Sequence, residues 1–375
     1  MLRTGPSRRW LVAVNELEAA LVAHIAEVGP IGFDEYVDHA LYAPGLGFYA
    51  GGRGAGRRRD FVTSPEVGPL FGALVARALD QWWDDLGRPD PYVVVEAGAG
   101  PGTLARTVLA AAPRCAAALR LVLVDDAEVQ WVDHPAGVTS RRDLPRPGEL
   151  AGGPVVVIAN ELLDNLPFGL VELTGQGWSE VAVTATGAAG AGPARLVEVL
   201  VPLEPKRAAW CRGKAGREAE VGTRLPVQAA AAAWLHEALA LAGGGRVVVL
   251  DYAGTTHELA QRPWTEWLRT YAAHDRAGHP LERPGSADIT VEVAVDQLAT
   301  VRPPDRQRSQ ADFLRAHGLD ELADAGARRW RALGLAGGLG AIAGRSAVHE
   351  AEALIDPAGL GGFQVLEWIG PGPLG

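Results

Sequence analysis

A glycine-spaced loop in this 375-residue chain has the residue types and the spacing of a nucleotide-cofactor site. Three consecutive valines at 93–95 suit a strand buried on both faces, as in a parallel sheet covered by helices. An acid and three alternating glycines follow, which allow a sharp turn and bring backbone N–H groups close to a ligand. A dinucleotide fingerprint would need glycine in place of Thr103, so the spacing favours S-adenosylmethionine over NAD. The candidate cofactor-binding residues here are Glu96, Gly98, Gly100, Gly102 and Thr103.

Acidic residues further along the chain are candidates for the rest of this site. Asp125 ends the next apolar run, where a carboxylate can accept both ribose hydroxyls of an adenosine cofactor, and the adjacent Asp126 competes for that role. Asp143 lies in the loop before the next strand and could accept from an adenine amino group or be a solvated acid. Because acids occur at these positions, we interpret the glycine loop as part of a cofactor site rather than as a simple turn between a strand and a helix.

A second apolar run, at residues 155–159, leads directly to Asn160, Glu161 and Asp164. Open α/β sheets bind ligands at the carboxyl ends of their strands. These three polar side chains are therefore the candidate catalytic residues, and Asn160 is also a candidate cofactor contact. The alternative is that Asn160 and Asp164 cap the turn that follows.

Two further segments could face the same crevice. Ser64 and Glu66 flank a proline at the start of a helical pattern, which is typical of a helix cap. They follow a Gly- and Arg-rich loop at 51–60 that we expect to be mobile, so we also predict them as cofactor contacts in a lid. Asp251 and Tyr252 end another buried run, where they either line the crevice or form a structural pair.

The elements that must position these residues alternate between strands and helices, which predicts an α/β fold with a parallel sheet. The predicted core strands are 93–96, 121–125, 155–159 and 246–251, with a closing strand near 362–368. Predicted helices include 15–28, 33–42, 64–79, 227–241, 264–271 and 310–317, and short strands at 171–173 and 178–184 predict an antiparallel hairpin. The predicted regions are an N-terminal helical and lid region (1–90), a cofactor-binding core (91–255) with the hairpin insertion around 171–226, a mostly helical substrate or accessory region (256–345) and a C-terminal strand returning to the core (346–375).

Composition limits the kinds of partner. A net charge of -10 argues against nucleic-acid binding, which needs a basic surface. No apolar run approaches the length of a transmembrane helix, so we expect no membrane insertion. Cys115 and Cys211, like the nine histidines, lack metal-ligand spacing, so we predict no metal site. Unpaired cysteines fit a reducing compartment, and we expect a cytoplasmic protein.

These segments, in their order along the chain, resemble the MidA-like family of S-adenosylmethionine-dependent methyltransferases, which includes the mitochondrial protein arginine methyltransferase that assists respiratory complex I assembly. The segments that carry the resemblance are 33–36 (FDEY), 60–66 (DFVTSPE), 96–104 (EAGAGPGTL), 159–167 (ANELLDNLP), 251–252 (DY) and 284–290 (PGSADIT). The resemblance implies a Rossmann-like class I methyltransferase sheet, S-adenosylmethionine as the cofactor and methyl transfer to arginine in a protein substrate. The chain departs from the family pattern at Pro101, where the family usually has arginine.

Methyl transfer to a guanidinium needs assistance, because its lone pairs are delocalised and its pKa exceeds about 12. We predict that Glu161 and Asp164 hold the guanidinium fork while Asn160 orients it, which leaves one nitrogen to attack the methyl group. Two alternatives stay open: a methyltransferase acting on a small-molecule N or O acceptor, and a non-catalytic assembly factor that binds S-adenosylmethionine. A nicotinamide-dependent oxidoreductase is the least favoured alternative, and a homodimer is compatible with the sequence.

Overall fold

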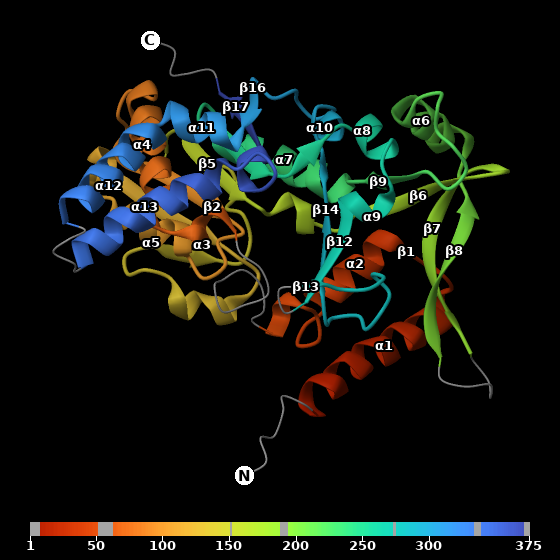
Figure 1. Ribbon diagram of the computed structural model, residues 1–375. Coiled ribbons are helices and arrows are strands. Elements are labelled where there is room, and N and C mark those ends of the chain that lie inside the picture. Colours follow the sequence, from red (N-terminus) through yellow and green to blue (C-terminus); the bar gives the residue numbers. More distant parts are fainter. Residues whose placement is uncertain are drawn as a thin grey trace.

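A seven-stranded mixed sheet forms the centre of the computed structural model, which describes residues 8–51, 63–150, 152–187, 194–272, 275–333 and 339–370 (Figure 1). Its strands, in spatial order, are β16 (Arg306–Ser309), β17 (Gln364–Ile369), β10 (Arg246–Asp251), β5 (Val155–Asn160), β2 (Tyr92–Ala97), β3 (Leu119–Val124) and β4 (Thr139–Arg141). The last five are mutually parallel, whereas β17 is antiparallel to both its neighbours. The predicted α/β class, the four core strands and the closing strand are confirmed. The loop expected at 51–60 lies, from residue 52 on, outside the described residues.

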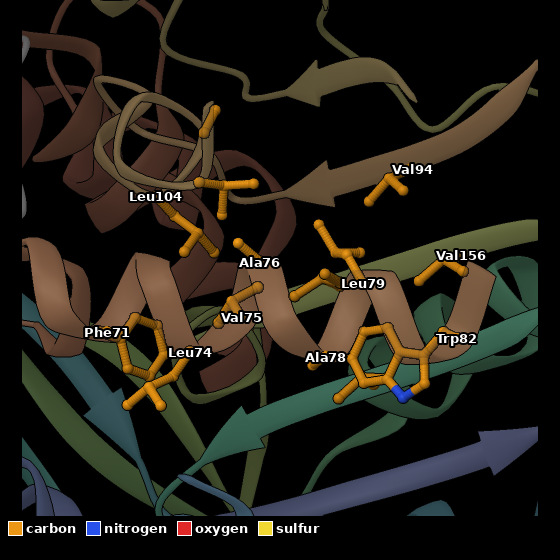
Figure 2. Packing of buried hydrophobic residues seen from close by; sticks show 14 of the residues in the cluster. Phe71, Leu74, Val75, Ala76, Ala78, Leu79, Trp82, Val94, Leu104 and Val156 are labelled. Carbon is orange, nitrogen blue, oxygen red and sulfur yellow. The ribbon is translucent and has the colours of Figure 1, made fainter. Parts of the chain in front are cut away.

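Helices cover both faces of this sheet, because the valines of its central strands alternate between two apolar layers. Val94 of β2 and Val156 of β5 pack in one cluster with Leu79 and Trp82 of α4, as Figure 2 shows. The helices of that layer are α3 (Ser64–Val67), α4 (Pro69–Asp85), α5 (Thr103–Ala110), α11 (Gln310–Ala316), α12 (Leu319–Leu333) and α13 (Leu339–Ile355). On the other face, Val95 packs in a cluster with α7 (Ala229–Ala242) and α10 (Val295–Leu298). Full burial of one such side chain contributes about 1.5–3 kcal/mol, so the sheet is a firm support for the residues at its ends.

A second, antiparallel sheet of five strands lies beside the core (Figure 1). Its strands are β1 (Ile31–Gly32), β6 (Gly169–Thr174), β7 (Gly177–Thr186), β8 (Arg195–Pro202) and β9 (Arg224–Val227), and α6 (Pro205–Ala215) follows β8. The N-terminal helices α1 (Arg8–Val28) and α2 (Phe33–Tyr42) pack on this sheet, where Leu21 and Phe33 share an apolar cluster with Phe168 and Val181. The predicted hairpin is confirmed as β6 and β7, and the structure extends it to a whole sheet.

Short strands, which we call the accessory strands, also occupy the segment after β10. One pair consists of β11 (Ala253–Gly254) and β15 (Val293–Ala294). A three-stranded sheet consists of β12 (Leu268–Ala272), β13 (Asp275–Arg276) and β14 (Asp288–Val291), in the spatial order β13-β12-β14. The helices of this segment are α8 (Thr256–Ala260) and α9 (Trp264–Trp267). The helix predicted over 264–271 is wrong after its first four residues, because Leu268 and Thr270 are buried where β12 pairs with β14. Pairing with a neighbouring strand overrides the local helix pattern here. Arg269 and Tyr271 consequently occupy the alternate positions of a strand.

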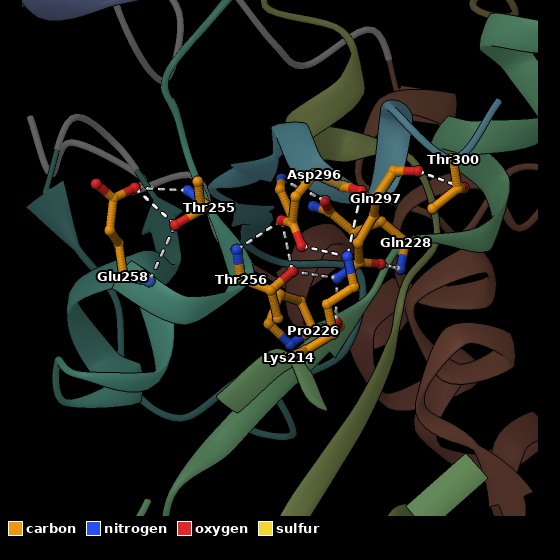
Figure 3. A network of polar contacts seen from close by, with 10 residues as sticks. Lys214, Pro226, Gln228, Thr255, Thr256, Glu258, Asp296, Gln297 and Thr300 are labelled. Atoms are coloured by element: carbon orange, nitrogen blue, oxygen red, sulfur yellow. Dashed lines mark hydrogen bonds and ion pairs between the residues drawn. The ribbon is translucent and has the colours of Figure 1, made fainter. Parts of the chain in front are cut away.

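A polar network joins this segment to the elements around it (Figure 3). Asp296 of α10 accepts hydrogen bonds from the backbone N–H and the hydroxyl of Thr256 at 2.7 and 2.8 Å, and its other oxygen pairs with Lys214 of α6. Next to it, the Gln228 N–H donates to the Gln297 side chain at 2.9 Å. Four separate parts of the chain meet in this network, which holds the accessory strands against the core.

Short 3₁₀ helices complete the described fold. They are η1 (Tyr49–Gly51), η2 (Arg114–Ala117), η3 (Glu128–Asp133), η4 (Leu163–Asn165) and η5 (Leu360–Gly362). Cys115 and Cys211 are both buried and free. Among the residues that the structure describes, no helix is both long and apolar enough to cross a lipid bilayer.

Candidate active site

The loop after β2 needs glycine for its backbone conformation. Gly98, Gly100 and Gly102 have φ values of 70°, 50° and 70°, in the left-handed region that residues with a Cβ avoid. Gly102 is the N-cap of α5, and a Cβ there would approach the His134 ring to 3.1 Å. A Cβ on Gly100 would lie 3.7 Å from the Gln130 side chain, at ordinary contact distance. The structure therefore leaves open space where a side chain on Gly100 would lie.

Arg106 of α5 holds this loop in shape. Its guanidinium donates to the carbonyl oxygens of Pro101 and Asp133 at 2.5 and 2.6 Å, and to the Thr103 hydroxyl at 2.8 Å. Hydrogen bonds from a charged donor are stronger than neutral ones, so three of them stiffen the loop. The Thr103 hydroxyl, predicted as a cofactor ligand, is thus already an acceptor for Arg106.

A cavity of about 390 Å³ adjoins the loop at the carboxyl ends of β2, β3 and β5, and we call it the glycine-loop cavity. Ligand and cofactor pockets usually measure about 300–1,000 Å³. The predicted cofactor ligands that line it are Glu66, Glu96, Gly98, Gly100, Thr103, Asp125, Asp143 and Asn160. Ser64 and Gly102 are not among its lining residues. Lining residues that sequence reasoning missed include Tyr42, Tyr49, Gln130, Leu144, Leu162, Asn165, Trp234 and Glu237.

The two neighbouring acids after β3 have different surroundings, although both line the cavity. Asp125 accepts hydrogen bonds from the backbone N–H groups of Gly100 at 2.7 Å and Ala127 at 2.9 Å, one on each carboxyl oxygen. Burial raises the pKa of Asp125. Asp126 is exposed, and its carboxylate lies 3.4 Å from the Arg142 guanidinium. Asp125 is therefore the acid held against the glycine loop, whereas Asp126 pairs with a surface cation.

Ser64 contributes to the site by binding Glu161. The sequence predicted instead that Ser64 contacts the cofactor. The Ser64 side chain is fully buried, and its hydroxyl donates to the Gln310 side chain at 3.0 Å. Its backbone N–H donates to Glu161 Oε1 at 3.0 Å, and the Asn160 amide donates to the same oxygen at 3.0 Å. Two donors from separate segments therefore fix the Glu161 carboxyl in place.

Glu161 and Asn160 both have features of functional residues. Glu161 has a φ of 52°, a conformation that costs a non-glycine residue about 1–3 kcal/mol and persists where the surroundings impose it. Burial, assisted by the charge of Asp164, raises the pKa of Glu161 to about 8. The Asn160 side-chain oxygen is buried and has no hydrogen-bond partner within the described part of the chain. Such an oxygen is available to a donor on a ligand.

A second cavity, of about 240 Å³, shares Glu161 and Asn165 with the glycine-loop cavity, and we call it the acidic cavity. Its other lining residues are Asp164, Tyr252, Arg269, Tyr271, Asp288, Thr290 and Phe363. The predicted catalytic residues are thus divided between the two cavities. Asn160 lines the first, Asp164 lines the second and Glu161 lines both.

The two carboxyl oxygens of Asp164 differ in their hydrogen bonding. Its Oδ2 accepts from the Tyr252 hydroxyl, whereas its Oδ1 is buried and lacks a partner among the described residues. Burial raises the pKa of Asp164 to about 6, against the lowering effect of the Tyr252 hydrogen bond. Asp251 accepts from the backbone N–H groups of Leu163 at 3.1 Å and Asp164 at 3.3 Å. Asp251 therefore positions the turn that carries Asp164, while Tyr252 lines the acidic cavity.

The residues around the glycine-loop cavity fit S-adenosylmethionine. That molecule carries hydrogen-bond donors on its ribose and on its amino group, and the cavity offers acceptors on Asp125, on Glu96 and on the unpartnered oxygen of Asn160. Glu96 is buried at the end of β2, and burial raises its pKa to about 8. A cationic ligand beside Glu96 favours its ionised form. These residues could hold the cofactor.

Among the residues that the structure describes, one group of metal-type ligands occurs outside both cavities. His24, Glu35 and His39 of α1 and α2 have ligand atoms within 4.8 Å of one another. His24 and Glu35 already share a hydrogen bond of 2.9 Å, which accounts for their proximity without an ion. The spacing along the sequence did not reveal this group, because His24 lies on a different helix from the other two.

Sequence reasoning missed the residues that join the two cavities. Tyr42 and Tyr49 stack with ring centroids 5.6 Å apart on the wall of the glycine-loop cavity. The Tyr49 hydroxyl and the Asn165 amide each donate to Asp288 at 2.9 Å. Asp288 lies in the segment 284–290, which contributed to the family resemblance without suggesting a role for this residue.

Comparison with known proteins agrees with this geometry. Residues 74–309 match a family described as "Putative S-adenosyl-L-methionine-dependent methyltransferase". The chain is 28% identical over 310 residues to the mitochondrial protein arginine methyltransferase NDUFAF7 homolog of Drosophila melanogaster, across 74% of this chain and 68% of that protein. It is 27% identical over 341 residues to mitochondrial NDUFAF7 of Mus musculus, across 80% of this chain and 73% of that protein. Both relatives are named mitochondrial, so the cytoplasmic location of this chain stays a prediction.

A solved structure is similar over almost the whole chain. It is a Burkholderia thailandensis protein bound to S-adenosyl-homocysteine, with a TM-score of 0.77, 29% sequence identity, and coverage of 98% of this chain and 95% of that one. S-adenosyl-homocysteine is what S-adenosylmethionine becomes when it loses its methyl group, and the predicted cofactor is confirmed. From the family match over more than half its length, together with this similarity, the chain belongs to the MidA-like family of S-adenosylmethionine-dependent methyltransferases.

Proposed function

We propose that this protein transfers a methyl group from S-adenosylmethionine to the side chain of an arginine in a protein substrate. The observation that carries the proposal is the acidic cavity, which shares Glu161 with the glycine-loop cavity and adds two further carboxyl groups. Buried carboxyl groups favour a cationic ligand, because a cation offsets their desolvation and mutual repulsion. The curated relatives are named protein arginine methyltransferases, which supports the same acceptor.

Glu161 and Asp164 hold the acceptor guanidinium in this mechanism. Carboxylates bound to two of its nitrogens localise positive charge there and leave the third nitrogen richer in electron density. Glu161 lines both cavities, so it can hold the fork beside the cofactor, while Asn160 orients it. Bound S-adenosylmethionine supplies the electrophilic methyl group. Positioning of the acceptor by these residues, with water excluded, provides most of the acceleration.

Asp164 takes one proton from the guanidinium nitrogen that it holds as the N–C bond forms at the third nitrogen, and a proton shift within the group leaves a methylguanidinium cation. The Asp164 Oδ1 lacks a partner among the described residues, so it can accept that proton. A pKa raised to about 6 makes Asp164 a better base than an ordinary aspartate, which titrates near pH 4. The Tyr252 hydroxyl stabilises the ionised form of Asp164 before the transfer.

The cofactor contacts form the second part of the proposal. Asp125 binds the ribose hydroxyls, as an acid at the end of the second strand does in related sheets. Glu96 and the unpartnered oxygen of Asn160 face the amino group of the methionine moiety. The remaining proposed contacts, all of which line the cavity, are Glu66, Gly98, Gly100, Thr103 and Asp143.

Methyl labelling tests the arginine acceptor. The full-length protein is incubated with isotope-labelled S-adenosylmethionine and a cell extract, and mass spectrometry locates the label, which we expect on protein arginine. Glu161→Gln should lower labelling by about a hundredfold and leave S-adenosyl-homocysteine binding nearly unchanged. Glu282→Gln, the same change at an exposed acid, is the control and should behave like the native protein. Equal labelling by Glu161→Gln and the native protein would contradict the proposal.

A small-molecule acceptor is the second candidate, and the size of the acidic cavity is compatible with it. A space of about 240 Å³ can hold a free guanidine as readily as the end of an arginine side chain. In the labelling experiment, label confined to small molecules selects this candidate. Cofactor binding with no labelled product of either kind selects the non-catalytic assembly factor.

A further inference from the structure

Asp288 is a carboxylate of the acidic cavity that the proposed methyl transfer does not use. It is 1% exposed at the first position of β14, where it pairs in register with Tyr271 of β12. Both residues line the acidic cavity. The accessory strands, rather than the core sheet, therefore bring this third carboxyl group to the acceptor's space.

Two donors from the wall of the glycine-loop cavity hold Asp288. The Tyr49 hydroxyl and the Asn165 amide each donate to its Oδ1 at 2.9 Å. Tyr49 stacks on Tyr42 with ring planes 18° apart, and the Tyr42 hydroxyl donates to the Asn165 carbonyl oxygen at 3.0 Å. Tyr42, Tyr49 and Asn165 all line the glycine-loop cavity. Asp288 thus faces one cavity while residues that line the other set its orientation.

The charges around Asp288 favour a cation. Burial, and then the charge of Asp164, raise the pKa of Asp288 to about 8. Glu161 lines the same cavity, and Arg269 is the one guanidinium among its described lining residues. Three carboxyl groups thus face a single fixed cation. A ligand with positive charge restores the balance and favours ionisation of the carboxyl groups.

We propose that Asp288 is a third contact for the acceptor cation and that Tyr49 and Asn165 couple acceptor binding to cofactor binding. A guanidinium presents five N–H donors around its plane, so carboxylates from separate elements can each bind one edge. A cofactor that packs against Tyr49 restrains its hydroxyl, which in turn holds Asp288 in the orientation that the acceptor needs. Because coupling is reciprocal, the acceptor must tighten cofactor binding by the same factor. This inference rests on the arginine acceptor proposed above.

Calorimetric titration of the full-length protein with S-adenosyl-homocysteine measures this coupling. The second ligand is N-acetyl-arginine amide, and the uncharged N-acetyl-citrulline amide is its matched control. We expect the arginine compound to tighten S-adenosyl-homocysteine binding by about fivefold or more, and the citrulline compound to leave it unchanged.

Two variants test whether the coupling depends on Asp288 and Tyr49 in a protein that is still folded. Asp288→Asn should bind S-adenosyl-homocysteine alone within about threefold of the native affinity, and both Asp288→Asn and Tyr49→Phe should lose the effect of the arginine compound. Retained binding of S-adenosyl-homocysteine shows that a variant is folded. Asp324→Asn, the same change at an exposed acid of α12, should keep the coupling in full.

Undiminished coupling in Asp288→Asn or Tyr49→Phe overturns the inference, and so does the absence of coupling in the native protein. The labelling experiment keeps this result separate from the proposed function. Protein arginine labelling that needs Glu161 but is unaffected by Asp288→Asn leaves the proposed function intact and overturns the role of Asp288. Coupling to the arginine compound without any labelled arginine supports the binding role of Asp288 and contradicts the proposed transfer.

Discussion

The glycine-loop cavity and the acidic cavity share Glu161 but are assembled from different kinds of segment. The first centres on the glycine loop after β2, with Asp125 just after β3 and Asn160 at the end of β5, although residues as distant as Tyr42 and Trp234 also line it. The second collects side chains from five separate places, at 161–165, 252, 269–271, 288–290 and 363. A cofactor site of the first kind can be recognised from a local motif, whereas an acceptor site of the second kind depends on packing between distant segments.

The cavities also differ in the property that selects a ligand. At the glycine loop, positive φ angles and bare backbone determine how closely a ligand can approach. In the acidic cavity, the carboxyl groups of Glu161, Asp164 and Asp288 surround the space that we propose for the acceptor. Changes in the first cavity should therefore remove all binding of cofactor, and changes in the second should alter methyl transfer while cofactor binding persists.

The largest effect is expected from Gly100→Val in the glycine-loop cavity. The fold can accommodate the added Cβ, which would lie 3.7 Å from the Gln130 side chain, but the branched side chain fills the space beside the bare backbone. S-adenosyl-homocysteine binding should weaken by about a thousandfold in calorimetry, near 4 kcal/mol. Strain at a φ of 50° should lower the free energy of unfolding by about 1–2 kcal/mol.

Gly222→Val is the matched control for this strain. Gly222 has a φ of 94°, and nothing lies within 4 Å of an added Cβ. The control should lose similar stability in chemical denaturation and keep full affinity for S-adenosyl-homocysteine. A similar loss of affinity in both variants would show that backbone strain, and not the site, explains the effect.

Asp164→Asn should act on the acidic cavity and spare the glycine-loop cavity. The substitution keeps the size of the side chain but removes its charge and its capacity to accept a proton. We expect kcat for methyl transfer to fall by about a hundredfold, measured with labelled cofactor at saturation. S-adenosyl-homocysteine affinity should stay at the native value, as in the exposed control Asp324→Asn. If cofactor affinity fell as far as kcat, the division into two cavities would be wrong.

The pH profile of acceptor use should show an effect of about tenfold. The pKa of Glu161 is raised to about 8, so below that pH its carboxyl group is mostly protonated in the empty cavity and cannot pair with a cation. At saturating cofactor, kcat/KM for the acceptor should therefore rise by about tenfold between about pH 7 and about pH 9. Initial rates across this range measure the effect. A flat or falling profile would contradict a carboxylate-bound cation.

The smallest effect is expected from Tyr252→Phe, which removes one hydrogen bond to Asp164. That bond lowers the pKa of Asp164, so its loss should raise the pKa and move the acidic limb of the kcat profile to higher pH. Below the pKa of Asp164, near about pH 5, kcat should fall by about fivefold, the value of one hydrogen bond of about 1 kcal/mol. A loss of stability with an unmoved pH profile would make Tyr252 a structural residue only.

Much of the core sheet could be predicted because its signals are local. The valines at 93–95 and 155–157 are apolar towards both faces, as strands covered by two helix layers must be. The helix predicted over 264–271 failed because Leu268 and Thr270 are buried by pairing with β14, a partner that no local pattern reveals. The sequence predicted Ser64 as a cofactor contact, whereas its hydroxyl binds Gln310 across 246 residues of chain.

By itself, the sequence determined the glycine loop, the acids at the strand ends and through them the class of cofactor. These follow from properties of single residues, namely the freedom of glycine at positive φ and the preference of β-branched runs for buried strands. Only the tertiary structure decided that Asp164 and Asp288 share a cavity with Glu161, and that Tyr49 and Asn165 join it to the cofactor side. Those contacts arise when the accessory strands pack against the core sheet, and such long-range packing leaves no periodic signal in the sequence.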